Sequence, residues 1–87
     1  MSKPFKPGYH LAPIAKGQLG EISKIAEELE ELADAQAQGN RIMMMVELSD
    51  LYGAIEHFLE KHTPGIAMSD LAVMAATTRR AFENGRR

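Results

Sequence analysis

The sequence predicts an all-α protein in which three helices form one small domain. After residue 17, apolar residues recur at three- and four-residue steps, as on one face of a helix. The breaks between these stretches are short and contain Gly, Asn or Pro, and no stretch alternates as a β-strand does. A chain of 87 residues is long enough for one hydrophobic core, but domains this small are commonly stabilised further by disulfides, metals or oligomerisation.

Residues 1–16 are predicted to form an extended arm, and residues 17–87 a single all-α domain. The arm contains several residues that disfavour a helix, namely Pro4, Pro7, Gly8 and Pro13. Its aromatic residues, Phe5 and Tyr9, are expected to contact a partner subunit rather than a nucleotide base.

The first two helices are predicted at residues 18–38 and 41–61. The apolar positions of the first are Leu19, Ile22, Ile25, Leu29 and Leu32. Those of the second are Met44, Leu48, Leu51, Tyr52, Ile55, Phe58 and Leu59. Gly39 and Asn40 end the first helix, and so short a connection predicts that the two helices pack antiparallel.

A third helix is predicted after the break at residues 63–65. Ser69 is a favourable N-cap and Asp70 a favourable first-turn residue, while Asn84 and Gly85 mark the end. The apolar positions are Leu71, Met74, Ala75, Thr78 and Phe82. Three short helices leave apolar surface uncovered, so we expect a helical bundle formed by a homodimer or homotetramer.

Composition narrows the function classes. Ten basic and twelve acidic residues give a net charge of −2, which favours neither nucleic acid nor a membrane surface as a partner. The chain has no cysteine, so neither disulfides nor a cysteine-based zinc site can support the fold. Without an apolar run of about 18 residues or an N-terminal apolar segment, a cytoplasmic protein is expected.

Two acidic clusters are the most informative feature of the chain. Glu28 and Glu31 are three residues apart, as are Glu47 and Asp50, so each pair lies on one face of its helix. On a helical wheel Glu47 falls within the apolar arc of its helix, where a carboxylate is costly unless it is paired or bound to a metal. Antiparallel packing of the helices would bring all four carboxylates together.

Four converging carboxylates repel one another, and a hard divalent cation removes this repulsion. Ligands that are all oxygen atoms favour Mg²⁺, or Mn²⁺, over zinc. The alternative is that the glutamates of residues 27–31 are simply a solvated helix face with high helix propensity. The apolar surroundings of Glu47 favour the metal site.

The spacing Glu27-Glu28-x-x-Glu31, fifteen residues, Glu47-x-x-Asp50 resembles the signature of the MazG-like, all-α nucleoside triphosphate pyrophosphohydrolases. The resemblance covers residues 17 to about 60. The chain also resembles, on weaker evidence, the short single-domain members of this family that bacteriophages carry. It implies Mg²⁺-dependent hydrolysis of a (d)NTP to a (d)NMP and pyrophosphate. It also implies that the metal ligands are Glu28, Glu31, Glu47 and Asp50. If a phage carries the gene, the expected location is the cytoplasm of the bacterial host.

The resemblance further implies that Glu27 orients or deprotonates the attacking water. Cationic side chains are expected to bind the phosphates. Lys24 is one candidate, although an ion pair with Glu28 would also explain it. Arg79 and Arg80 are others, although arginines near a helix C-terminus also offset the helix dipole.

Two alternatives to this function stay open. The chain would be a non-catalytic interaction or regulatory module if it kept the bundle and lost turnover. It would be a different pyrophosphohydrolase if its substrate were, for example, phosphoribosyl-ATP.

Overall fold

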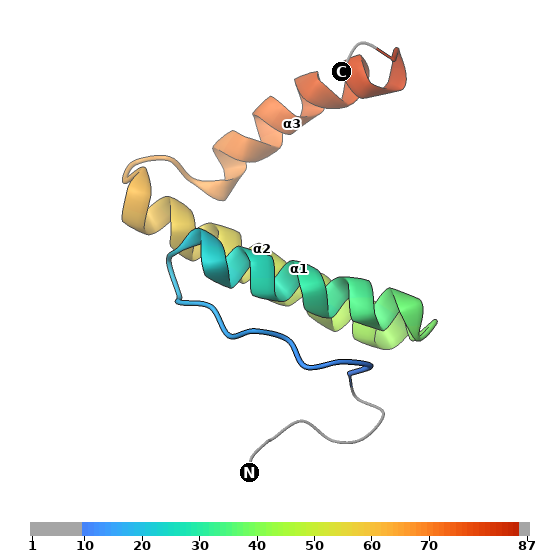
Figure 1. Ribbon diagram of the computed structural model, residues 1–87. Helices are drawn as coiled ribbons and strands as arrows, with labels where there is room; N and C mark the ends of the chain where they lie inside the picture. The colour runs from blue at the N-terminus through green and yellow to red at the C-terminus, as the bar shows by residue number, and fades with distance from the viewer. Residues whose placement is uncertain (1–9, 86–87) are drawn as a thin grey trace.

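The computed structural model describes residues 10–85 and contains three helices, α1 (Ile22–Ala37), α2 (Arg41–His62) and α3 (Met68–Glu83). Helices α1 and α2 pack side by side and antiparallel, whereas α3 leads away from this pair (Figure 1). The predictions of an all-α fold and of an antiparallel helix pair are therefore confirmed.

Helix α1 begins four residues later than the sequence predicted. Gly20 has a φ angle of +87°, a left-handed conformation that a helix does not accommodate. The residues before Ile22 instead form a turn, in which the Glu21 N–H donates to the Gln18 carbonyl at 3.0 Å. This turn directs the preceding segment back along α1.

The connection between α1 and α2 matches the sequence prediction. Gly39 has a φ of +69°, which ends α1. The Asn40 side chain then caps α2 by accepting a hydrogen bond from the Met43 N–H at 3.0 Å. So short a turn forces the two helices to pack against each other over their length.

Helix α3 begins at Met68, so the prediction of Ser69 as its N-cap is wrong. The N-cap is Ala67, two residues before Ser69, and its N–H donates a hydrogen bond to the carboxylate of Asp70 at 2.8 Å, which stabilises this start. The predicted end is confirmed, since Asn84 follows the helix and Gly85 has a φ of +72°.

The apolar core of the single chain is small. Among the described residues, the buried apolar side chains are those of Ala35, Ala54 and Leu59. Many residues that we predicted on buried faces are exposed instead, namely Leu19, Ile22, Leu29, Leu48, Tyr52, Met74 and Phe82. The reason is that acidic side chains occupy the interior of the α1–α2 pair, while α3 diverges from it (Figure 1).

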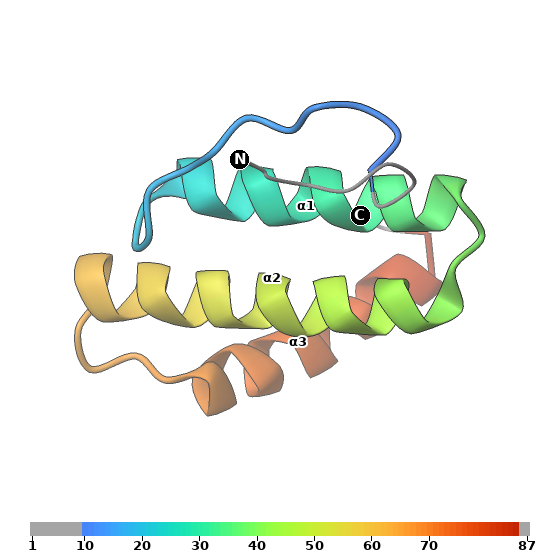
Figure 2. The same cartoon turned by 90° about the horizontal axis from the view of Figure 1, so that it is seen from below.

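Residues 10–20 run antiparallel to α1 along its length (Figure 2). The backbone N–H of Leu11 donates to Asp34 Oδ2 at 2.7 Å, and that of Gly17 donates to Glu27 Oε1 at 2.9 Å. Phe5 and Tyr9 of the predicted arm lie outside the described residues. In the described part of the chain, no helix has the length and apolar character needed to span a membrane.

Candidate metal centre

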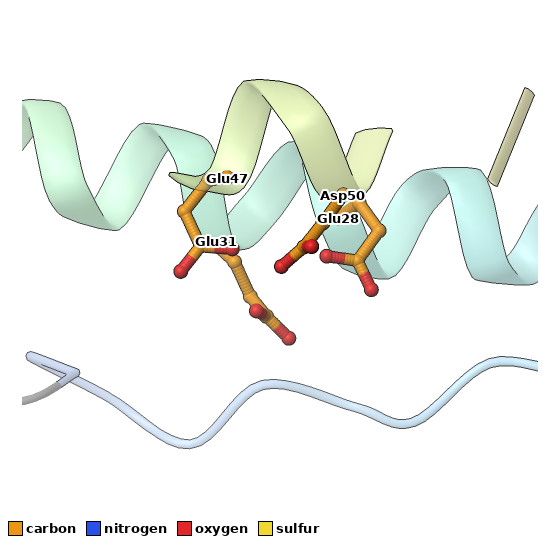
Figure 3. Close-up of side chains that lie close together, drawn as sticks. All are labelled: Glu28, Glu31, Glu47 and Asp50. Atoms are coloured by element: carbon orange, nitrogen blue, oxygen red, sulfur yellow. The ribbon is translucent and has the colours of Figure 1, made fainter. Parts of the chain in front are cut away.

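Four carboxylates converge between α1 and α2 (Figure 3). Glu28 and Glu31 project from α1, and Glu47 and Asp50 project from α2. One oxygen atom from each residue lies within 4.8 Å of the corresponding atoms of the other three. The predicted convergence is thus confirmed, and the spacing of three residues on each helix accounts for it.

Three carboxylate oxygens of the two inner acids, Glu28 and Glu47, lack hydrogen-bond donors in the described part of the chain. Glu47 is fully buried at 0% exposure and Glu28 is 5% exposed. Among the described residues, no group donates to Glu28 Oε1 or to either carboxylate oxygen of Glu47. Because an ionised carboxylate without a donor is costly to bury, these three oxygen atoms require a cation or a proton.

Burial favours the protonated form of two of these acids, Glu31 and Glu47. Burial raises the pKa of Glu31 to about 8, with further contributions from the neighbouring Glu47, Glu28 and Glu27. Burial also raises the pKa of Glu47, and the negative charges of Asp50 and Glu28 add to this effect. A protonated Glu31 carboxyl adjacent to Glu47 supplies one of the missing donors.

Binding of a divalent cation should therefore release protons at neutral pH. Glu31 must lose its proton to become a ligand, so the apparent affinity for Mg²⁺ should rise about tenfold per pH unit between pH 6 and 8 and level off above. Titration calorimetry in two buffers that differ in ionisation enthalpy measures the number of protons released. A pH-independent affinity with no proton release would contradict this assignment.

The pH dependence of stability has the same origin. A carboxyl whose pKa is raised by folding stabilises the folded state below its unfolded pKa of 4.5, and this contribution is lost as the pH rises through the folded value of about 8. The metal-free protein should thus lose stability between these pH values, and a saturating divalent cation should restore it.

Glu27 lies beside the cluster but is engaged elsewhere. It is 3% exposed, and its Oε1 accepts hydrogen bonds from the Gly17 N–H at 2.9 Å and from Lys24 Nζ at 3.1 Å. Burial opposes ionisation of Glu27, but these donors outweigh it and lower its pKa. Its role as the residue that orients or deprotonates water stays a prediction, for which Oε2 is the less engaged atom.

Lys24 forms the ion pair that we considered as its alternative role. Its Nζ lies 3.1 Å from both Glu27 Oε1 and Glu28 Oε2, and its side chain is 26% exposed. Burial lowers the pKa of Lys24, but the bonds to these two glutamates outweigh that effect and raise it. The lysine is next to the four carboxylates, and its charge is already balanced by Glu27 and Glu28.

Arg79 and Arg80 are not brought to the cluster within one chain. Both lie on α3, which leads away from the α1–α2 pair (Figure 1). Arg79 Nε is paired with Glu83 Oε2 at 3.0 Å on the same helix. Their predicted contact with substrate phosphates stays a prediction.

A groove of about 380 Å³ adjoins the carboxylates. Its lining residues are Leu19, Lys24, Glu28, Ser49, Asp50, Gly53, Ala54 and His57. The Nδ1 atom of His57 lies within hydrogen-bond distance of the Gly53 carbonyl, at 2.8 Å. Helical spacing places Gly53 and His57 on the same side as Asp50, but the sequence alone did not reveal the groove, because its other wall belongs to α1.

An extended arm was predicted at residues 1–16, but its attachment to α1 beside the four carboxylates was not predicted. The residues that form this attachment are Lys16, Gly17 and Asp34, and none of them showed a recognisable pattern in the sequence.

Comparisons of this chain with protein-family models, with curated proteins and with solved structures found no match.

Proposed function

We propose that this protein is a divalent-cation-dependent hydrolase that cleaves nucleoside triphosphates between the α and β phosphates. The observation that carries the proposal is the set of four converging carboxylates with three oxygen atoms that lack donors. A donor set made only of carboxylate oxygens fits Mg²⁺ or Mn²⁺. The resemblance of these acids in type and spacing to the MazG-like signature supports the same reaction.

Each acid has a proposed role in this reaction. Glu28, Glu31, Glu47 and Asp50 would hold the cation, which when bound offsets negative charge on the phosphates. Glu27 Oε2 would accept a proton from the attacking water. The water oxygen forms a bond to the α phosphorus while the bond from that phosphorus to the α–β bridging oxygen breaks, so that pyrophosphate leaves with this oxygen.

The groove beside Glu28 and Asp50 is the proposed location of the nucleotide. It is of the size expected for a small-molecule site, and Lys24 places a positive charge at its wall. Arg79 and Arg80 would add charge from a second copy, because α3 leads away from the α1–α2 pair of its own chain (Figure 1). The proposed assembly is accordingly a homodimer or a larger homo-oligomer.

The test is a panel of the eight common NTPs and dNTPs together with phosphoribosyl-ATP, with release of pyrophosphate as the readout. We expect Mg²⁺-dependent release from at least one triphosphate, Mn²⁺ as an effective substitute, and no release in EDTA. Release from phosphoribosyl-ATP alone would select the other pyrophosphohydrolase reaction. No turnover of any compound would favour the interaction module.

A further inference from the structure

Residues 10–17 form a strap across the side of the α1–α2 pair toward which the four carboxylates point (Figure 3). Asp34 fixes one end of this strap through the Leu11 N–H at 2.7 Å, and Glu27 fixes the other through the Gly17 N–H at 2.9 Å. Along α1, these two acids lie on either side of Glu28 and Glu31. The strap is thus attached on both sides of the candidate metal centre.

The fixed end at Gly17 requires a residue without a side chain. A Cβ atom added to Gly17 would clash with the backbone oxygen of Ser23, in the first turn of α1. Because that oxygen belongs to the helix backbone, it cannot move aside as a flexible side chain would. Any larger residue must displace the strap from α1 at this point.

Lys16 directly precedes this attachment and places a second cation beside the site. Its side chain is 89% exposed, and its Nζ lies 3.7 Å from Glu27 Oε2. Lys24, by contrast, is 26% exposed and lies 3.1 Å from two carboxylates. An exposed lysine with one long ion pair loses little when it turns toward a ligand, whereas Lys24 would have to give up two short contacts.

We infer that Lys16 binds the phosphates of the cation-bound substrate, and that Gly17 and Asp34 are positioning residues that hold the strap where Lys16 reaches them. The inference rests on the proposed function. A triphosphate adds several negative charges to a site already lined by carboxylates, so positive groups beyond the metal are needed to retain it. Within one chain, Lys16 meets this need better than the arginines of α3, which leads away (Figure 1).

The test compares Lys16→Gln, Lys16→Arg and the control Arg41→Gln. Arg41 is exposed at the start of α2, at the opposite end of the helix pair from Gly17, so its replacement removes the same charge far from Lys16 and from the attachment at Gly17. Binding of inorganic tripolyphosphate in excess Mg²⁺ is measured by calorimetry, alongside KM and kcat for the triphosphate that the wild type hydrolyses best. We expect Lys16→Gln to weaken binding and to raise KM by roughly 10- to 100-fold, with little change in kcat or melting temperature.

Two further variants test the positioning residues with Lys16 retained. Gly17→Ala displaces one end of the strap and Asp34→Ala releases the other, so both should raise KM in the same direction as Lys16→Gln. Asp34→Ala introduces no steric clash, and keeps this test available if Gly17→Ala does not fold.

The outcomes separate this inference from the proposed function. Near-normal KM in Lys16→Arg, with raised KM in Lys16→Gln alone among the charge variants, supports the phosphate-binding role. If the wild type hydrolyses triphosphates and Lys16→Gln behaves like Arg41→Gln, the Lys16 role is wrong while the proposed function stands. If Lys16→Gln and Lys16→Arg both have a lowered melting temperature, Lys16 has a structural role and the phosphate-binding role is wrong. If the wild type neither binds tripolyphosphate nor turns over any triphosphate, both proposals fail.

Discussion

Replacing Glu47 with Gln is expected to abolish hydrolysis and to raise the melting temperature of the metal-free protein. Glu47 is fully buried, and no described group donates to either of its carboxylate oxygens. Glutamine keeps the shape, removes the charge that must be buried, and brings an N–H₂ donor toward the neighbouring acids. Most substitutions at a buried polar residue destabilise a protein, so a gain of stability here would be diagnostic.

The loss of activity should be large because Glu47 is a proposed metal ligand. Substitutions of residues that merely support a ligand cost roughly 10- to 100-fold in metal affinity or activity, and loss of a ligand should exceed this. Glu30→Gln is the matched control, because Glu30 is exposed on the same helix as Glu28 and Glu31. Circular dichroism, thermal melts with EDTA and pyrophosphate release measure the outcome. Equal effects of the two substitutions would contradict the placement of Glu47 as the central acid.

The second large effect concerns assembly. A single chain fully buries few apolar side chains in its described part, those of Ala35, Ala54 and Leu59, while many larger ones are exposed. Ile42 is 77% exposed and Val73 is 71% exposed. So little buried apolar surface contributes little hydrophobic stabilisation to a single chain. We therefore expect a dimer or a larger assembly whose melting temperature falls on dilution, because folding and association are coupled.

A charged substitution on the exposed apolar surface tests this expectation. Met45 is 66% exposed on α2, so Met45→Glu would change the stability of a monomer by no more than about 0.5 kcal/mol. In an assembly that covers Met45, the same substitution should shift the protein toward smaller species and lower its melting temperature. Gln36→Glu adds the same charge at an exposed polar position of α1 and should do neither. A monomer at micromolar concentrations in light scattering, with a melting temperature independent of concentration, would contradict the prediction.

Helical periodicity predicted the acidic site better than it predicted the apolar core. Glu47 was placed correctly because its three-residue spacing from Asp50 and its position within an apolar arc both follow from one helix. Leu48 and Tyr52 were placed wrongly, since both are exposed. A wheel identifies the apolar side of a helix, but it does not say which part of that side contacts α1 and which part is left for another surface.

The strap could not be predicted for a different physical reason. Its attachments join Leu11 to Asp34 and Gly17 to Glu27, which are 23 and 10 residues apart in the sequence. Both bonds come from backbone N–H groups, which every residue except proline carries, so the residue types gave no signal. Only the path of the chain, reversed by the turn at Gly20, brings these groups together.

Direct binding of Mn²⁺, followed by electron paramagnetic resonance, tests the central claim that the four carboxylates hold a divalent cation. The wild type should bind Mn²⁺ saturably, Mg²⁺ should displace it, and Glu47→Gln should lose the binding while Glu30→Gln retains it. At a Mg²⁺ concentration 100 times the dissociation constant, binding should stabilise the wild type by about 2.7 kcal/mol. Absence of saturable Mn²⁺ binding by the wild type, or equal binding by Glu47→Gln, would contradict the assignment of this cluster as a metal centre.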